Sequence, residues 1–104
     1  METTIESVIS IKLEALPNQS FTIRLADNRY QIRIICISDN LMAATIVRDN
    51  VTLIQNMRIV AGIPLLPSHH ARGFGNFIFI TPDETYPYYT EFNNGHEFYF
   101  IPEA

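Results

Sequence analysis

Three histidines and one cysteine are the residues of this chain best suited to binding a metal ion. His69 and His70 are adjacent, and His96 and Cys36 lie far from them in the sequence. Adjacent side chains of an extended segment point in opposite directions, so the pair is poorly placed to bind one ion. Zinc sites usually combine two short-spaced ligand pairs, and this chain has only one pair, without a suitable gap. The sequence therefore favours histidines in surface loops, and we expect no metal and no cofactor.

A second candidate for chemistry is a set of three carboxylates, on Asp83, Glu84 and Glu91. Acid–base catalysis by paired carboxylates needs surroundings that separate their pKa values, and nothing in the neighbouring sequence provides them. The Ser68-His69 pair lacks the motif that surrounds a catalytic serine. Cys36 lies among isoleucines, where an unreactive core thiol is expected. We therefore expect a protein that is not an enzyme.

Residues 72–79, RGFGNFIF, resemble the RNA-recognition signature R-G-F-G-F-V-x-F. Asn76 is an insertion in that pattern, and it moves Phe77 and Phe79 to the opposite face of a strand. The RNA-binding fold also needs two helices, which the sequence does not indicate. A net charge of −4 and a pI of about 5.2 further argue against a nucleic-acid partner. We expect Phe77 and Phe79 to be buried packing residues.

Aromatic residues are the best functional candidates, because ten of the twelve Phe and Tyr residues lie between Phe74 and Phe100. Tyrosine suits an interface, since its ring buries area while its hydroxyl stays polar. The alternative is that the tyrosines fold back over one end of the domain. We predict an interface that combines them with apolar residues of the preceding loop and strand: Leu65, Leu66, Phe74, Phe77, Tyr86, Tyr88, Tyr89 and Phe92.

Charge is sparse and unevenly placed along the chain. Charged residues make up 17% of the sequence, against about 25% in a typical domain. A surface with so little charge is either partly covered by a partner or that of a somewhat sticky monomer, and we favour the covered surface. All seven basic residues lie at or before Arg72, and the part from Gly73 onward carries acids only. Such polarity can orient a subunit in an assembly, or it can arise by chance in a short chain. Three arginines of one predicted hairpin face either contact an acidic partner or are simply solvated: Arg24, Arg29 and Arg33.

The remaining global features predict an ordinary soluble domain. A chain of 104 residues corresponds to one domain, over residues 1–104. A single cysteine excludes an internal disulfide and fits a reducing compartment. The opening METTIESV does not read as a signal peptide, and no apolar run reaches the length of a membrane span. We expect a soluble protein made in a cytoplasm, without a membrane-spanning segment.

The first 60 residues predict a meander of about five short strands. Alternation over Val8–Leu13 predicts a half-buried strand, and the prolyl segment 17–19 predicts a turn. Residues 20–33 predict a hairpin with a two-residue Asp27-Asn28 turn, which sets Leu25 opposite Tyr30. Residues 34–37 break the alternation and indicate either a bulge or cover on both sides.

Two further turns complete the predicted meander. At Asp39-Asn40 we prefer a three-residue loop, which sets Ile46 opposite Ile34, over a two-residue turn, which sets it opposite Arg33. Asp49-Asn50 predicts a two-residue turn with Ile46 opposite Leu53 and Met42 opposite Met57. The β-branched neighbours of residues 53–59 weigh against a helix there.

The second half predicts a shaped loop and more strands. Residues 62–73 contain prolines and glycines and lead into a strand over 74–80 that is apolar on both faces, covered either by its own fold or by another subunit. Two prolines keep 81–89 out of a central strand, residues 93–95 form a turn, and 97–101 form the last strand. The fold class is all-β: a small antiparallel meander or barrel of about seven strands with no significant helix.

Several segments together resemble the cyanophage baseplate plug-like family, from contractile-tailed bacteriophages and related prophages. They occur in order from about Ile9 to Phe100: residues 13–21 (LEALPNQSF), 30–33 (YQIR), 62–67 (GIPLLP), 75–77 (GNF) and 86–92 (YPYYTEF).

This resemblance implies a structural protein of the virion, without catalysis or cofactor. It implies a place at the centre of the tail baseplate near hub and spike, symmetric copies around the tail axis, and contacts with hub, spike or tail tube proteins. The motif implies no site residues. The alternative function is a small β-barrel that binds carbohydrate or single-stranded nucleic acid through the aromatic residues of 86–92.

Overall fold

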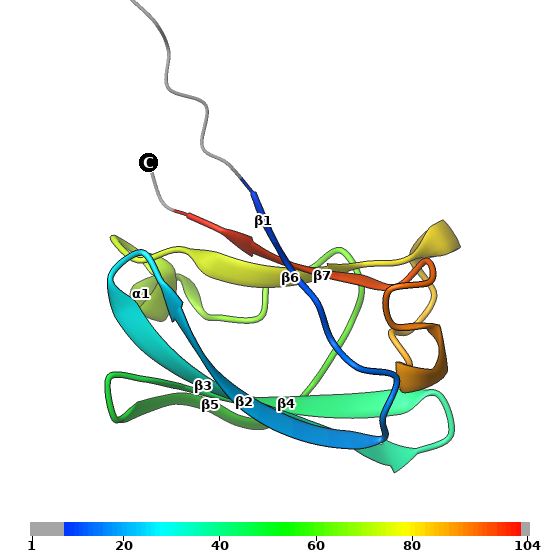
Figure 1. Ribbon diagram of the computed structural model, residues 1–104. Helices are drawn as coiled ribbons and strands as arrows, with labels where there is room; N and C mark the ends of the chain where they lie inside the picture. The colour runs from blue at the N-terminus through cyan, green and yellow to red at the C-terminus, as the bar shows by residue number, and fades with distance from the viewer. Residues whose placement is uncertain (1–7, 103–104) are drawn as a thin grey trace, which may run out of the picture.

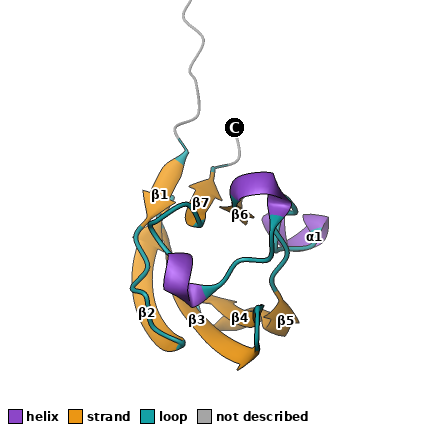
Figure 2. Ribbon diagram, turned by 90° about the vertical axis from the view of Figure 1, so that its right-hand side faces the viewer, coloured by secondary structure: helices purple, strands orange, loops and turns teal. Residues whose placement is uncertain are grey.

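Two antiparallel sheets face each other in the computed structural model, which describes residues 8–102. One sheet has the order β1-β7-β6, and the other is the meander β2-β3-β4-β5 (Figures 1 and 2). This confirms the all-β class with seven strands, although the two sheets do not close into one barrel. The elements are β1 Ile9–Ile11, β2 Asn18–Leu25, β3 Asn28–Ser38, β4 Leu41–Arg48, β5 Val51–Arg58, β6 Asn76–Ile80 and β7 Glu97–Ile101, with α1 Ser68–Ala71 and two short 3-10 helices, η1 Pro82–Glu84 and η2 Tyr89–Glu91.

β1 does not belong to the meander, so the expected five consecutive strands are corrected to four. Instead, β1 pairs with β7 at the other end of the chain, with Ile9 opposite Phe100 and Ile11 opposite Phe98. The turn expected at residues 17–19 is also wrong. β2 already begins at Asn18, because the carbonyl of Pro17 accepts a hydrogen bond from the backbone N–H of Cys36 at 2.8 Å and extends the ladder.

The β2–β3 hairpin is present, but its register differs by two residues from the predicted one. The turn is Ala26-Asp27, with φ of 49° and 67°, and Ile23 lies opposite Tyr30. Asn28 is not in the turn; its side-chain amide donates to the carbonyl of Ala26 at 2.9 Å and holds the turn closed. A slip of two residues leaves every side chain on its predicted face, so alternation could not distinguish the two registers.

Bulges set the register of the next two strand pairs. The turn after β3 has two residues, Asp39-Asn40, so the preferred three-residue loop is wrong; a bulge near Ile37 sets Ile46 opposite Ile32. The Asp49-Asn50 turn is confirmed, with φ of 49° and 71°. Two irregularities between β4 and β5 then set Ile46 opposite Ile54 and Met57 opposite Ala44, which corrects both predicted pairs.

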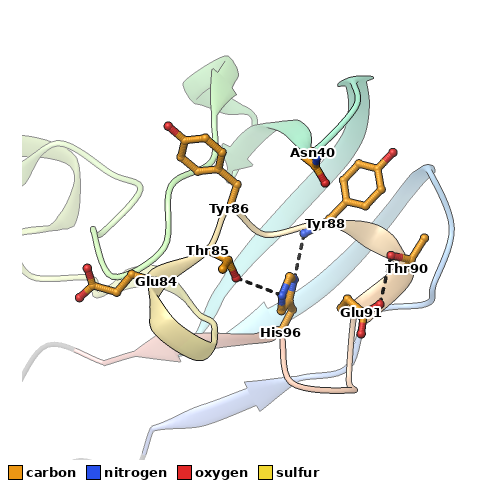
Figure 3. Close-up of a pocket in the computed structure, with 8 residues that line it drawn as sticks. All are labelled: Asn40, Glu84, Thr85, Tyr86, Tyr88, Thr90, Glu91 and His96. Atoms are coloured by element: carbon orange, nitrogen blue, oxygen red, sulfur yellow. Dashed lines mark hydrogen bonds between the residues drawn. The ribbon is translucent and has the colours of Figure 1, made fainter.

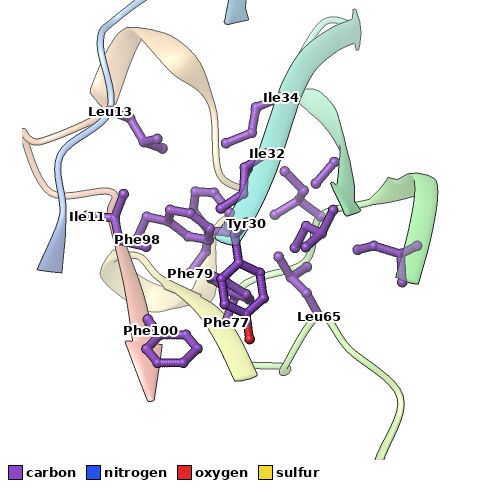
Figure 4. Packing of buried hydrophobic residues seen from close by; sticks show 14 of the residues in the cluster. Ile11, Leu13, Tyr30, Ile32, Ile34, Leu65, Phe77, Phe79, Phe98 and Phe100 are labelled. Atoms are coloured by element: carbon purple, nitrogen blue, oxygen red, sulfur yellow. The ribbon is translucent and has the colours of Figure 1, made fainter. Parts of the chain in front are cut away.

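The core lies between the two sheets and is rich in aromatic rings (Figure 4). Tyr30 of β3 meets Phe77 of β6 edge to face, with ring centroids 5.1 Å apart and planes at 80°. Phe77 and Phe79 stack on Phe98 of β7 at 5.6 and 4.4 Å. These four rings are buried, so Phe77 and Phe79 are packing residues as predicted. Such pairs add about 0.5–1.5 kcal/mol each beyond their buried area.

β6 is shorter than the expected strand over residues 74–80, and the chain itself covers only one of its faces. Phe77 and Phe79 point inward, whereas Ile78 is half-buried and Ile80 is 45% exposed. Gly75 precedes the strand with φ of 119°, where a Cβ would lie 2.6 Å from Cζ of Phe100 and 2.7 Å from the carbonyl oxygen of Ile101. A residue without a side chain is therefore required at this close approach.

Local turns accompany the remaining strands as expected. Residues 93–95 form a turn, β7 covers Glu97–Ile101, and 81–91 contain only 3-10 turns. Within residues 8–102, no helix is long and apolar enough to cross a membrane. The segment METTIESV lies almost wholly outside the described residues, so its interpretation stays a prediction.

Candidate interaction surface

Two ends of the sandwich carry the segments that the sequence analysis singled out. We call residues 81–96, together with the β3–β4 turn at Asp39-Asn40, the tyrosine end. We call residues 66–75, together with the turns at Ala26-Asp27 and Asp49-Asn50, the loop end. Residues 62–65 lead to it alongside β6, where the Gly62 N–H donates to the carbonyl of Phe79 at 2.8 Å and the Leu65 N–H to that of Phe77 at 2.9 Å. Figure 1 shows η1 and η2 at one extremity of the molecule and α1 at the other. The structure therefore separates the two predicted interface segments.

Proline and threonine shape the beginning of the tyrosine end. Pro82 starts η1, and the hydroxyl of Thr81 donates to the carbonyl of Thr85 at 2.6 Å. Asp83 and Glu84 adopt φ of 53° and 55°, a left-handed conformation that costs free energy for residues other than glycine. Because this turn is cross-linked by side-chain hydrogen bonds, it presents the tyrosines that follow in a defined direction.

His96 connects both sides of this segment. Its Nδ1 accepts a hydrogen bond from the backbone N–H of Tyr88 at 3.0 Å, and its Nε2 lies 3.5 Å from the hydroxyl of Thr85 (Figure 3). An Nδ1 that accepts carries no proton, so this geometry requires the neutral imidazole with its proton on Nε2. The ring is 9% exposed and contacts Thr85 and Tyr88 on the opposite side of the segment. Its role is therefore to hold the segment together.

The tyrosine end is hollowed by a cleft of about 660 Å³. Figure 3 shows Tyr86, Asn40 and Tyr88 along one side of it, with His96 below. Tyr86 is 47% exposed, and the guanidinium of Arg58 lies 5.8 Å from its ring centroid. The eight lining residues are Asn40, Glu84, Thr85, Tyr86, Tyr88, Thr90, Glu91 and His96.

Tyr88 is tied to the meander through Cys36. Its hydroxyl oxygen lies 3.8 Å from Sγ of Cys36. Cys36 is half-buried, so the prediction that it is a core thiol is wrong. This hydrogen bond, together with desolvation, raises the pKa of Tyr88 to about 12. The rings of Tyr88 and Tyr89 contact each other, with centroids 4.8 Å apart. Both rings are therefore committed to neighbours in the chain.

The loop end is held by two polar side chains. Asn76 clamps the backbone of Leu66: its Oδ1 accepts from the Leu66 N–H at 2.8 Å, and its Nδ2 donates to the Leu66 carbonyl at 3.0 Å. Arg48 of β4 donates from Nη1 to the carbonyl of His70 at 2.8 Å, and its guanidinium lies 3.5 Å from the ring centroid of Phe74. Arg48 is 8% exposed, so it joins α1 and the following turn to the meander.

Two histidines lie on the four-residue helix α1 of the loop end, where His69 is exposed and His70 is half-buried. Their ring centroids lie 4.1 Å apart, with the ring planes tilted by 43°. Desolvation, with smaller contributions from His69 and Arg48, lowers the pKa of His70. Within residues 8–102, no three His, Cys, Asp or Glu side chains are close enough to hold a metal ion. His96 and Cys36 lie near the tyrosine end instead.

The eight predicted interface residues divide into two groups. Four are buried within the chain: Leu65, Leu66, Phe77 and Phe92. Four keep exposed surface, but at different ends: Phe74 is 36% exposed at the loop end, Tyr86 is 47% exposed at the tyrosine end, and Tyr88 and Tyr89 are half-buried there. The interface role therefore stays a prediction, carried mainly by Phe74 and Tyr86.

Sequence reasoning did not assign the positioning roles of Arg48, Asn76 and His96. Arg48 is separated from Met42 and Ile46 by an even number of residues, so it lies on the same inward face of β4. This spacing could have predicted that the arginine is buried. The sequence marks Asn76 as an insertion in the RNA-recognition pattern and as part of the segment 75–77 of the family resemblance, and neither feature predicts its hydrogen bonds to Leu66. The contacts of His96 join residues 8 and 11 positions away and have no short-range signature.

A model of the protein family described as "Cyanophage baseplate Pam3 plug gp18" matches residues 8–103. This match covers the two sheets and both ends of the sandwich. No curated protein matches the chain.

Proposed function

Because this chain belongs to the cyanophage baseplate Pam3 plug gp18 family, we propose that it is a structural, non-catalytic component at the centre of a contractile phage tail baseplate. In this proposal the chain lies near hub and spike and contacts hub, spike or tail tube proteins. It reaches the virion after assembly in the host cytoplasm. The observation that carries the proposal is the extent of the family match, which spans both sheets and both ends.

The geometry supports a role in assembly. The sheets form a packed body around aromatic pairs. The segments at its ends are fixed by side-chain hydrogen bonds, in which Arg48 donates and Asn76 and His96 accept. A surface held in one conformation loses little entropy when a partner binds. Tyr86 and Phe74 expose large rings on such fixed segments, as expected for anchor residues of an interface.

The same geometry disfavours the alternative of a ligand-binding module. A stacking platform for sugars or bases needs free aromatic faces. Tyr88 and Tyr89 contact each other, and the Tyr88 hydroxyl contacts Cys36. Only Tyr86 of the three is exposed, so the tyrosine end resembles a contact surface more than an open stacking site.

Incorporation into tails tests the proposal. Mass spectrometry of purified phage tails should find the chain, and a Tyr86→Ser variant should be incorporated less, because the anchor is lost while the core is untouched. Ile80→Ser is the matched control: Ile80 is 45% exposed, but on the outer face of β6. Absence of the wild-type chain from tails that contain hub and spike proteins would refute the function. Equal incorporation of wild type and Tyr86→Ser would remove the tyrosine end from the proposal.

A further inference from the structure

β2 is a free edge of the four-stranded sheet. It pairs with β3 only, over eight residues and without a register shift. The carbonyl of Pro17 accepts from the N–H of Cys36 on β3, and successive residues of an antiparallel strand bond in alternating directions. The backbone N–H and C=O groups of the even-numbered residues Ser20, Thr22 and Arg24 therefore point away from β3. Within residues 8–102, no strand pairs with that side of β2.

The other three edges of the two sheets are protected in ways that natural proteins commonly use. β1 has only three residues. β5 is irregular, because Asn56 has φ of 50° and the β4–β5 register shifts twice. β6 is covered by residues 62–65, whose Gly62 and Leu65 N–H groups donate to its carbonyls. β2 is long, regular and uncovered, and apart from the charge of Arg24 it carries none of these protections.

Apolar surface also lies open beside this edge. Phe21 and Ile23 of β2 are half-buried, whereas the residues opposite them on β3, Ile32 and Tyr30, are fully buried. A cleft of about 350 Å³ is lined by the first half of β2 and by the connection from β1, including the exposed Leu16. Figure 1 shows β1 and β2 diverging from this connection. A strand added to β2 would therefore have room for its side chains and would cover Phe21 and Ile23.

The charges beside the edge disfavour a second copy of this chain as the added strand. β2 and β3 contain no Asp or Glu, and Arg24 lies directly opposite Arg29. Their three arginines are Arg24, Arg29 and Arg33, and the neighbouring carboxylates lie outside the strands, on Glu14 in the connection and on Asp27 and Asp49 in turns. Pairing β2 with β2 of a second copy would place two such sets of arginines on one sheet, where like charges at opposed positions are unfavourable. A different chain with a carboxylate on its outward side would offset this charge.

We propose that β2 binds an extended segment of another baseplate protein, which adds to the meander as a fifth strand. The backbone of this segment pairs with the free N–H and C=O groups of Ser20, Thr22 and Arg24. Its alternate side chains cover Phe21 and Ile23 on the inner side and place a carboxylate beside Arg24 on the outer side. The inference rests on the proposed function and adds the means by which the chain is held in the baseplate.

A proline substitution tests the backbone contact. Thr22→Pro removes the outward N–H in the middle of the edge, and it leaves the ladder to β3 intact because edge strands tolerate proline where the N–H faces away from the sheet. Thr22→Ala is the matched control, since it loses the same side chain but keeps the N–H. Mass spectrometry of purified phage tails, relative to the hub protein, should find Thr22→Pro roughly tenfold less incorporated than wild type and Thr22→Ala incorporated like wild type. Equal incorporation of a folded Thr22→Pro chain, or equal loss with Thr22→Ala, would overturn the inference.

Amide hydrogen exchange of the wild-type chain tests the same contact without a substitution. In the isolated chain, the amides of Phe21 and Ile23 should exchange slowly and those of Ser20, Thr22 and Arg24 rapidly. In assembled tails, which are deuterated, quenched, dissociated and analysed by mass spectrometry with single-residue fragmentation, the amides of Ser20, Thr22 and Arg24 should become protected.

The outcomes separate this inference from the proposed function. Rapid exchange of these three amides in tails that contain the chain would overturn the inference and leave the function intact. Absence of the wild-type chain from tails would overturn both. Protection of the three amides in the isolated chain, with a mass that rises with concentration in analytical ultracentrifugation, would identify a second copy as the added strand and overturn the assignment to another protein.

Discussion

Replacing Gly75 by alanine is the most direct test of the packing between β6 and β7. The new Cβ would lie 2.6 Å from Cζ of Phe100 and 2.7 Å from the backbone carbonyl oxygen of Ile101. Phe100 is fully buried against Tyr30 and Phe77, so its ring cannot swing away. The carbonyl oxygen belongs to β7 and cannot shift without moving the strand.

Two costs add in this variant. Overpacking a core costs about 1–3 kcal/mol, and a side chain at φ of 119° adds about 1–3 kcal/mol of backbone strain. We therefore expect Gly75→Ala to lower the free energy of unfolding by about 2–6 kcal/mol, a large part of the roughly 5–15 kcal/mol of a whole domain. Since about 1 kcal/mol shifts the Tm of a domain this size by about 4–8 °C, the melting temperature should fall by at least about 8 °C.

Gly73→Ala is the matched control. Gly73 also has a positive φ, of 81°, but no atom lies within 4 Å of the Cβ position. This variant should show the strain alone, about 1–3 kcal/mol. Urea unfolding followed by circular dichroism measures both variants. Equal destabilisation by the two substitutions would refute the close approach of Gly75 to Phe100 and Ile101.

Three further substitutions test the contacts at the two ends. Arg48→Met keeps an unbranched side chain but leaves the carbonyl of His70 in α1 without its donor. We expect about 1–3 kcal/mol lower stability and faster amide hydrogen exchange over residues 68–74; unchanged exchange there would contradict the role of Arg48 in holding α1. His96→Ala removes the acceptor of the Tyr88 N–H and should cost a similar amount in thermal unfolding, whereas the exposed His69→Ala should cost almost nothing; equal melting temperatures would argue against the bridging role. Cys36→Ala should lower the pKa of Tyr88 from about 12 toward 10.0. Because folding raises the pKa of Tyr88, the stability that this hydroxyl contributes is present below about pH 10 and is lost as the pH rises toward 12. Spectrophotometric titration, with Tyr88→Phe as the reference, measures the pKa, and the same Tyr88 pKa in Cys36→Ala as in wild type would refute the sulfur contact.

Alternation along each strand predicted which side chains point inward, but not which residues face each other. Slips by an even number of residues keep the same faces, so the Ala26-Asp27 turn could not be distinguished from Asp27-Asn28. The bulges of β4 and β5 depend on contacts across the strands, such as the Asn56 N–H donating to the hydroxyl of Thr45 at 2.9 Å. Such contacts exist only after the strands have paired.

In the candidate site, too, the sequence predicted local features better than contacts between distant residues. Clustering of tyrosines in residues 86–92 predicted an interface, which stays a prediction. The prolines predicted an irregular backbone, which the two 3-10 helices confirm. Exposure was less predictable, because Leu65, Leu66 and Phe92 belong to the core only through contacts with distant strands. Arg48 reaches α1 from 22 residues away, a separation at which sequence patterns carry no information.

The pairing of β1 with β7 has a consequence for synthesis of the chain. Ile9 leaves the ribosome long before its partner Phe100 is made. The meander can form from neighbouring segments, while the opposite sheet must wait until β7 has been made. Long-range pairing slows folding and leaves apolar surface uncovered in the meantime. A nascent chain that stalls before residue 97 would therefore present the inner side of the meander to solvent and depend on chaperones for its solubility.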